Sequence, residues 1–195
     1  MAEPGSFLEI DWSKLPVPTD DGAARHLEGA PLADVALPSS AGGQVSLAKV
    51  PGRTVLFIYP MTGTPGVALP DGWDAIPGAR GCTPHTCAFR DLHADLKSAG
   101  AAQVFGLSTQ TMAEQQATVE RLHLPFPLLS DDALGLTRAM SLPSMEVDGK
   151  TMIKRLALIL DDGVIVKVFY PVFPPDRNAG DVLAWLRTNP RTASV

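Results

Sequence analysis

The sequence has only two cysteines, Cys82 and Cys87, and no apolar run of the length that a membrane-spanning helix requires. Its first residues also lack the basic segment followed by an apolar segment that marks a secretory signal. We therefore expect no membrane association and a cytoplasmic location. Because a reducing compartment disfavours permanent disulfides, chemical reactivity is the better explanation for the two cysteines.

A concentration of positive charge is also missing. The 16 Lys and Arg residues are scattered, and the formal net charge is -5. Such a chain has no basic stripe that could neutralise a phosphate backbone, so we expect no nucleic-acid partner. The 195 residues do include 45% hydrophobic residues, 18 prolines and 17 glycines. This composition is typical of one globular domain with many turns.

Strand-like and helix-like patterns alternate along the middle of the chain. Strands are predicted at 54–59, 103–108, 126–129, 156–160 and 164–170, and helices at 83–98, 111–123, 133–140 and 179–187. Segments 33–37 and 44–47 flank a turn and predict an N-terminal β-hairpin, and Asp161-Asp162-Gly163 predicts a hairpin near the C-terminus. The order indicates an α/β protein with a thioredoxin-like fold, in which helices flank a central mixed β-sheet.

The first 28 residues have little periodicity and are predicted to form an N-terminal arm. Its apolar residues Phe7, Leu8 and Trp12 are expected to dock on the body of the protein. Residues 29–190 then form the single domain.

The two cysteines lie where a Gly- and Pro-rich loop meets a predicted helix. Cys82 is placed at the helix N-terminus, where unpaired backbone N–H groups and the helix dipole favour the thiolate, which is the nucleophilic form of cysteine. Cys82 is therefore the predicted nucleophile. Cys87 lies inside the helix and is the predicted resolving partner.

The spacing of the cysteines also predicts motion. Positions five apart on an ideal helix have Cα atoms about 8–9 Å apart, whereas a disulfide tolerates at most about 7 Å. The first turns of the helix must therefore unwind if the cysteines join. Pro84 donates no N–H, which makes the first turn easier to open.

The residues around the cysteines resemble a known pattern. In peroxiredoxins of the peroxiredoxin Q or bacterioferritin-comigratory-protein subfamily, Tyr-Pro-x-x-x-Thr-Pro-Gly-Cys-Thr is followed by a second cysteine five residues after the first. Here the first half is Tyr59-Pro-Met-Thr-Gly-Thr-Pro-Gly66, and the second half is Cys82-Thr83 with Cys87. Residues 67–81 separate the halves and are interpreted as an insertion in the active-site loop.

The resemblance implies further site residues. Pro60 would shield the cysteine, and Thr64 would bind the peroxide and the thiolate. Arg155, which begins a strand similar to the family's Arg-containing strand, would stabilise the thiolate and orient the peroxide. In a competing alignment, Pro77 is the shielding proline and the threonine is missing.

The resemblance also implies a peroxidase mechanism without a cofactor or metal. Cys82 would reduce hydrogen peroxide or an organic hydroperoxide and become a sulfenic acid, and Cys87 would condense with it to form a disulfide. Thioredoxin or glutaredoxin would then reduce this disulfide. Relatives occur as monomers and dimers, so both states stay open.

Two residues near the cysteines have alternative interpretations. His85 is either a solvated helix residue or an accessory acid that donates to the leaving oxygen. Trp73, in the inserted loop, is either a lid over the site or an anchor of the loop.

Three other functions compete with the peroxidase. Cys82, His85, Cys87 and His93 have the residue types of a zinc site, but they diverge too widely along a helix to meet at one ion. A disulfide oxidoreductase of thioredoxin fold would have two residues between its cysteines, and four lie between these. A redox-sensing module would need neither Arg155 nor the loop of Thr64.

Overall fold

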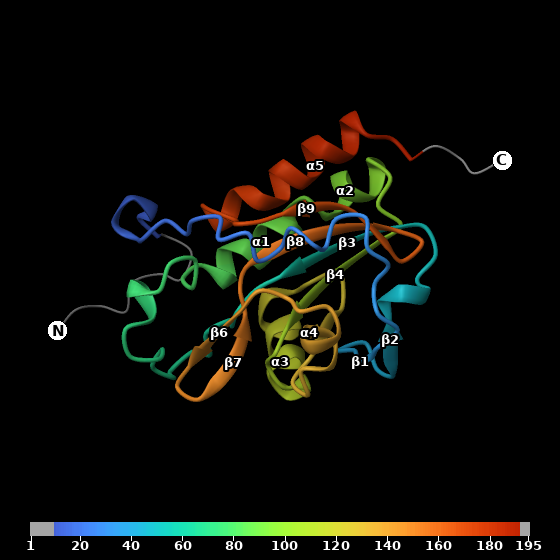
Figure 1. The fold of residues 1–195 in the computed structure, drawn as a ribbon. Coiled ribbons are helices and arrows are strands. Elements are labelled where there is room, and N and C mark those ends of the chain that lie inside the picture. Colours follow the sequence, from blue (N-terminus) through green and yellow to red (C-terminus); the bar gives the residue numbers. More distant parts are fainter. Residues whose placement is uncertain (1–9, 192–195) are drawn as a thin grey trace.

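The computed structural model describes residues 10–191, and its centre is a five-stranded mixed β-sheet (Figure 1). The strand order is β5-β4-β3-β8-β9. The strands are β3 (Arg53–Ile58), β4 (Gln103–Ser108), β5 (Leu128–Ser130), β8 (Leu156–Asp161) and β9 (Val164–Phe169). β3 pairs in parallel with β4, as the alternation of strands and helices predicts, and antiparallel with β8. The predicted antiparallel hairpin at Asp161-Asp162-Gly163 joins β8 to β9. The predicted mixed sheet and thioredoxin-like fold are confirmed.

Strand β3 is the middle strand of the sheet, and all of its residues are buried. Its side chains alternate between the two faces of the sheet. Leu56 and Ile58 belong to one hydrophobic cluster, whereas Val55 and Phe57 belong to the other. Tyr59 continues the second cluster, so β3 leads directly into the loop that precedes the cysteines.

Helices cover the face of the sheet on which Phe57 lies. They are α1 (Cys82–Asp91), α2 (His93–Ser98) and α5 (Asn178–Thr188). Figure 1 shows α5 and α2 above the strands, with α1 beside β8. The predicted helix over 83–98 is thus divided, because Leu92 leaves the helical conformation with φ -95° and ψ 7°. Helix α3 (Met112–Leu122) begins at a capping box of Thr111 and Glu114 and contacts β5 at the sheet edge.

The opposite face is covered by the N-terminal segment, the N-terminal hairpin and α4 (Gly135–Ala139). The predicted hairpin is confirmed as β1 (Ala36–Pro38) and β2 (Gln44–Ser46). Leu27 is fully buried in this cluster and Ala24 is nearly so, and these contacts extend the packed core into the predicted arm. Trp12 docks as predicted, whereas Phe7 and Leu8 lie outside the described residues.

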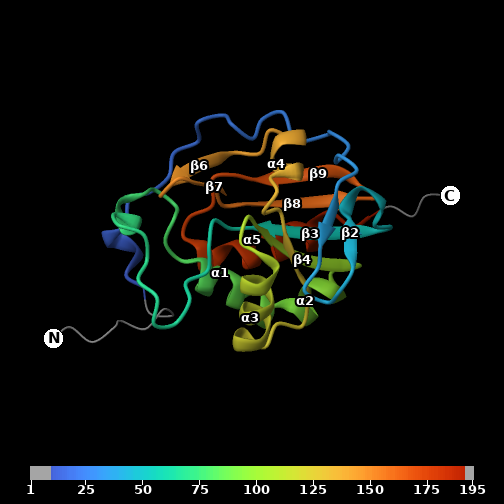
Figure 2. The same cartoon turned by 90° about the horizontal axis from the view of Figure 1, so that it is seen from below.

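One hairpin of the structure has no counterpart among the predicted elements. It consists of β6 (Ser144–Val147) and β7 (Lys150–Ile153), which pair with each other as a separate two-stranded sheet. Figure 2 shows this hairpin on the same side of the molecule as the loop that carries residues 61–81. Within residues 10–191, no helix combines the length and the apolar character needed to cross a membrane.

Candidate active site

Cys82 is the first residue of α1, as predicted. The chain reaches it through Gly81, whose φ of 100° is accessible at low cost only to glycine. The Cys82 side chain is 4% exposed, and its Sγ lies 3.5 Å from the carbonyl oxygen of Ala79. Cys82 therefore lies at the N-terminal end of the helix dipole and is almost fully removed from solvent.

Arg155 is brought from the start of β8 to the Cys82 sulfur. Its Nη2 lies 3.1 Å from Cys82 Sγ and also donates to the carbonyl oxygens of Ala79, at 3.1 Å, and Arg80, at 3.2 Å. Arg155 is 3% exposed, so its positive charge acts in a poorly solvated environment. This arrangement places a buried positive charge in contact with the sulfur.

His85 contacts the same guanidinium from the next turn of α1. Its Nδ1 lies 2.9 Å from Arg155 Nη1, and its Nε2 lies 2.9 Å from Asn178 Oδ1 at the start of α5. His85 has no exposed surface, so the interpretation of a solvated helix residue is wrong. Burial and the adjacent Arg155 charge lower the pKa of His85 well below its ordinary value.

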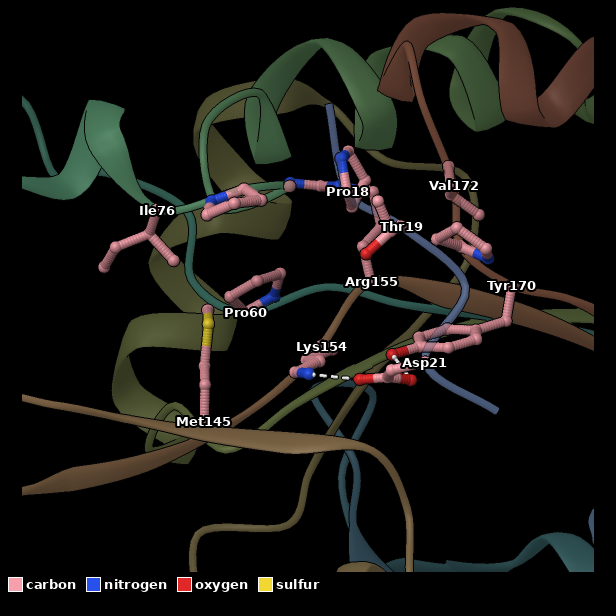
Figure 3. A pocket seen from close by; sticks show the side chains of 13 residues that line it. Pro18, Thr19, Asp21, Pro60, Ile76, Met145, Lys154, Arg155, Tyr170 and Val172 are labelled. Carbon is pink, nitrogen blue, oxygen red and sulfur yellow. Dashed lines mark hydrogen bonds and ion pairs between the residues drawn. The ribbon is translucent and has the colours of Figure 1, made fainter. Parts of the chain in front are cut away.

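Cys82 and Arg155 border different cavities. Cys82 borders a cavity of about 20 Å³ together with Met61, Leu69 and Trp73, which is room for roughly one water molecule. Arg155 borders a larger cavity of about 220 Å³. Figure 3 shows that cavity, with the Lys154–Asp21 ion pair of 2.8 Å at one side.

The larger cavity is bordered by residues from both alignments. Pro60 and Pro77, the two candidates for the shielding proline, both line it. Pro60 is buried, and Ile76 and Gly78 place the end of the insertion on the same wall. Both candidates for the shielding proline thus lie in the wall of the cavity that Arg155 borders.

Thr64 is not brought to Cys82. It is exposed and lines a separate cavity with Asp71 and Lys150, and no hydrogen bond joins it to Cys82 among the described residues. The insertion explains this placement. Residues 67–81 carry the chain away after Thr64, and the insertion's Leu69 and Trp73, together with Met61, fill the space next to the sulfur.

Cys87 is a free thiol on the same helix as Cys82. It is 6% exposed, and burial raises the pKa of the Cys87 thiol. In this conformation Cys87 is therefore a poor nucleophile.

The insertion folds into a small hydrophobic cluster. Trp73 lies in the short 3₁₀ helix η3 (Trp73–Ala75) and is 3% exposed. Its cluster contains Ala79 and, from the β6–β7 hairpin, Val147 and Met152. Trp73 thus anchors the loop on the hairpin and also borders the cavity at Cys82.

The predictions missed Asn178 and the β6–β7 hairpin. Asn178 follows a run of prolines at a helix start, which gives no indication of its contact with His85. The four residues of the zinc alternative do not form a site: in residues 10–191, no group of three or more His, Cys, Asp or Glu side chains could hold a metal ion.

Comparison with known proteins gives a consistent result. The Redoxin family model matches residues 27–183. Peroxiredoxin Q of Triticum aestivum is 34% identical over 73% of this chain and 58% of its own length. Peroxiredoxin Q of Sedum lineare is 30% identical over 85% of this chain and 80% of its own length. The chain therefore spans well under two thirds of the length of the first of these relatives.

Solved structures agree with the sequence relatives. Peroxidoxin BcpB of Mycobacterium tuberculosis has a TM-score of 0.67 and 30% identity, with coverage of 85% of this chain and 98% of that protein. Peroxiredoxin Q of Xanthomonas campestris has a TM-score of 0.63 and 26% identity, with coverage of 89% and 96%. The chain thus belongs to the redoxin family and, within it, to the peroxiredoxin Q group.

Proposed function

We propose that this protein is a thiol peroxidase in which Cys82 attacks a hydroperoxide. The contact between Arg155 Nη2 and Cys82 Sγ, at 3.1 Å, carries the proposal. A helix N-terminus and a buried guanidinium both favour the thiolate of Cys82. The same guanidinium can donate to a peroxide oxygen as charge develops on it.

The proposed reaction has three steps: oxidation of Cys82, disulfide formation with Cys87, and reduction of the disulfide. The Cys82 thiolate attacks one peroxide oxygen, the O–O bond breaks, and the leaving oxygen departs as water or an alcohol after taking a proton. Cys82 is oxidised to a sulfenic acid. The Cys87 thiol then displaces the hydroxyl as water and forms a disulfide, which an external dithiol reduces by thiol exchange.

The resolving step requires α1 to change shape. Both cysteines are buried within one regular helix, where positions five apart are about 8–9 Å from each other. Oxidation to the disulfide should therefore increase amide hydrogen exchange across 82–91. Unchanged exchange in the oxidised protein would contradict the resolving role of Cys87.

The relatives support the choice of substrate and reductant. One solved structure concerns the alkyl peroxide reduction activity of the Xanthomonas campestris bacterioferritin comigratory protein, which is 26% identical to this chain. We propose hydrogen peroxide and organic hydroperoxides as substrates and thioredoxin or glutaredoxin as the reductant. The proposal fits both a monomer and a homodimer. The cytoplasmic location stays a prediction, since the plant relatives are named chloroplastic.

Pro60 and Trp73 are proposed to control access to the site. Pro60 lines the cavity that Arg155 borders, and Trp73 closes the smaller one beside Cys82. Trp73→Ala should therefore raise activity toward bulky hydroperoxides more than toward hydrogen peroxide. If wild type and Trp73→Ala have equal activities toward both kinds of hydroperoxide, Trp73 only anchors the loop. Thr64 could serve the peroxide only after the loop of residues 61–81 rearranges.

Stopped-flow oxidation tests the proposal directly. Hydrogen peroxide and cumene hydroperoxide are mixed with the wild-type protein, Cys82→Ser and Cys87→Ser. If Cys82→Ser loses fast peroxide consumption and Cys87→Ser keeps it, the result supports Cys82 as the nucleophile. Fast consumption without Cys82 would overturn the peroxidase proposal.

The same variants separate the alternative functions. Cys87→Ser should react once and then fail to recycle with thioredoxin. A disulfide oxidoreductase or a redox sensor would instead exchange thiols without fast peroxide consumption.

A further inference from the structure

Arg155 is a buried cation without a carboxylate partner among the described residues. Its Nη2 contacts two loop carbonyls and the reacting sulfur, and its Nε has no hydrogen-bond partner. The partner of Nη1 is the imidazole of His85. That imidazole is therefore the side chain, other than the reacting cysteine, that hydrogen-bonds the guanidinium.

The tautomer of His85 follows from its two neighbours. A guanidinium only donates hydrogen bonds, so Nδ1 of His85 must accept from Arg155 Nη1. The ring proton then lies on Nε2 and is donated to Asn178 Oδ1, at 2.9 Å. A protonated imidazole would direct a second N–H toward Arg155, so this contact requires neutral His85.

The imidazole is held rigidly. The rings of Phe57 and Phe89 pack edge-on against it, with centroids 5.4 Å away in both cases. His85 and Asn178 are 0% and 2% exposed, so water cannot easily replace either hydrogen bond. Three elements, α1, α5 and the start of β8, are joined through this one chain of side chains.

We infer that His85 is a positioning residue that, oriented by Asn178, holds the Arg155 guanidinium against the Cys82 sulfur. The inference rests on the proposed peroxidase function and extends it to two residues that do not touch the reacting atoms. Because the imidazole is neutral, it fixes the direction of Nη2 without offsetting the positive charge that the thiolate and the leaving oxygen require. Cys82 adjoins this chain of contacts, and Tyr59, whose hydroxyl donates to Gln115, lies in the same hydrophobic cluster as Cys82.

The test compares four single variants. His85→Phe keeps a ring in the aromatic cluster and removes both hydrogen bonds. His85→Gln keeps a hydrogen-bond acceptor and a donor at this position. Asn178→Leu removes only the hydrogen bond between His85 Nε2 and Asn178 Oδ1. His93→Phe is the matched control, because His93 also lies beside an aromatic ring, that of Phe126 at 5.6 Å, but makes no contact with Arg155.

The measured quantity is the second-order rate constant for oxidation of Cys82 by hydrogen peroxide. His85→Phe should lower it about 10- to 100-fold, the loss that follows a displacement of about 1 Å in a catalytic group. His85→Gln should recover most of the loss, Asn178→Leu should show a smaller loss, and His93→Phe should match the wild type. Equal rates for His85→Phe and wild type would overturn the inference.

A double variant distinguishes positioning from folding. In an Arg155→Met background, His85→Phe should cause no further loss, because no guanidinium remains to be positioned. The same fold-loss in both backgrounds would mean that His85 serves only packing. If His85→Phe fails to fold, judged by circular dichroism, Asn178→Leu replaces it in this comparison.

Alkylation of Cys82 by iodoacetamide tests the position of Arg155 without any peroxide, and so independently of the proposed peroxidase function. If the wild type does not consume peroxide, the peroxidase proposal fails, whereas the rate of alkylation at pH 7 still reports on the contact between Arg155 and the sulfur. That rate should change in His85→Phe and stay the same in His93→Phe. An unchanged rate in His85→Phe would overturn the positioning role.

Discussion

The indole of Trp12 lies directly over Gly81, the residue that precedes Cys82. A β-carbon built on Gly81 would lie 2.6 Å from an indole carbon of Trp12 and 3.0 Å from Pro175. Trp12 is also fixed by a hydrogen bond of 3.0 Å from its Nε1 to Asp176. The N-terminal segment therefore closes the backbone turn that presents the candidate nucleophile.

Gly81→Ala should destabilise the protein and slow Cys82. The change introduces both a clash with Trp12 and a strained φ of 100°, and strain of this kind costs about 1–3 kcal/mol. Urea unfolding measures the cost. The control is Gly180→Ala in α5, where no atom lies within 4 Å of the new carbon and a gain of about 0.5–1 kcal/mol is expected. A Gly81→Ala protein as stable as the wild type would contradict the close packing.

Arg155→Lys should lower the rate of Cys82 oxidation about 100-fold, although the positive charge is retained. Removal of one hydrogen-bond donor that is oriented toward a developing charge lowers a rate by about this factor. A lysine ammonium cannot contact the sulfur and His85 in the same fork-like geometry. Arg155→Met should lose at least as much. Stopped-flow kinetics measure both rates, and Arg187→Met, at an exposed position, is the control. Full activity in Arg155→Lys would show that charge alone is sufficient.

Thr64→Val should leave the rate of Cys82 oxidation within about 3-fold of the wild type, a difference of less than about 1 kcal/mol. Thr64 is exposed and lines a cavity that Cys82 does not border. The measurement is peroxide consumption under single-turnover conditions. A loss of tenfold or more would show that the loop rearranges and brings Thr64 to the peroxide, as the family pattern predicts.

The stability of the protein should fall between pH 7 and pH 5, partly because of His85. The pKa of His85 in the folded protein lies well below the ordinary 6.5, since burial and Arg155 disfavour the charged form. Below that ordinary value the unfolded chain binds a proton that the folded chain does not, so acid favours unfolding. The stability that depends on neutral His85 is fully present above pH 6.5 and is lost as the pH falls below that value.

Urea unfolding at pH 7.5 and pH 5.0 checks this sign. His85→Phe should show a smaller fall in the free energy of unfolding than the wild type, because its ring does not titrate. His93→Phe gives a reference for a histidine that is only partly buried. An equal fall in wild type and His85→Phe would mean that His85 takes up a proton in the folded state.

Local patterns predicted the elements that carry a strong signal within their own residues. The central strand, the Asp161-Asp162-Gly163 hairpin and the start of α1 follow from β-branched runs, turn residues with positive φ and a glycine before a helix. The break at Leu92 did not follow, because it depends on the packing of α1 and α2 against α5. The β6–β7 hairpin was also missed, although its turn residues Asp148 and Gly149 both have positive φ and carry the same Asp-Gly signal as the Asp161-Asp162-Gly163 turn.

The sequence by itself determined which cysteine begins the helix, and it indicated Arg155 through a family pattern. Only the tertiary structure decided what surrounds the sulfur. It brings Arg155, His85 and Asn178 into one buried line and leaves Thr64 outside it. The physical reason is that a helix start is set by neighbouring residues, whereas the side chains of this buried site come from segments as far as 93 residues apart. Only the packing of the whole domain places such segments together.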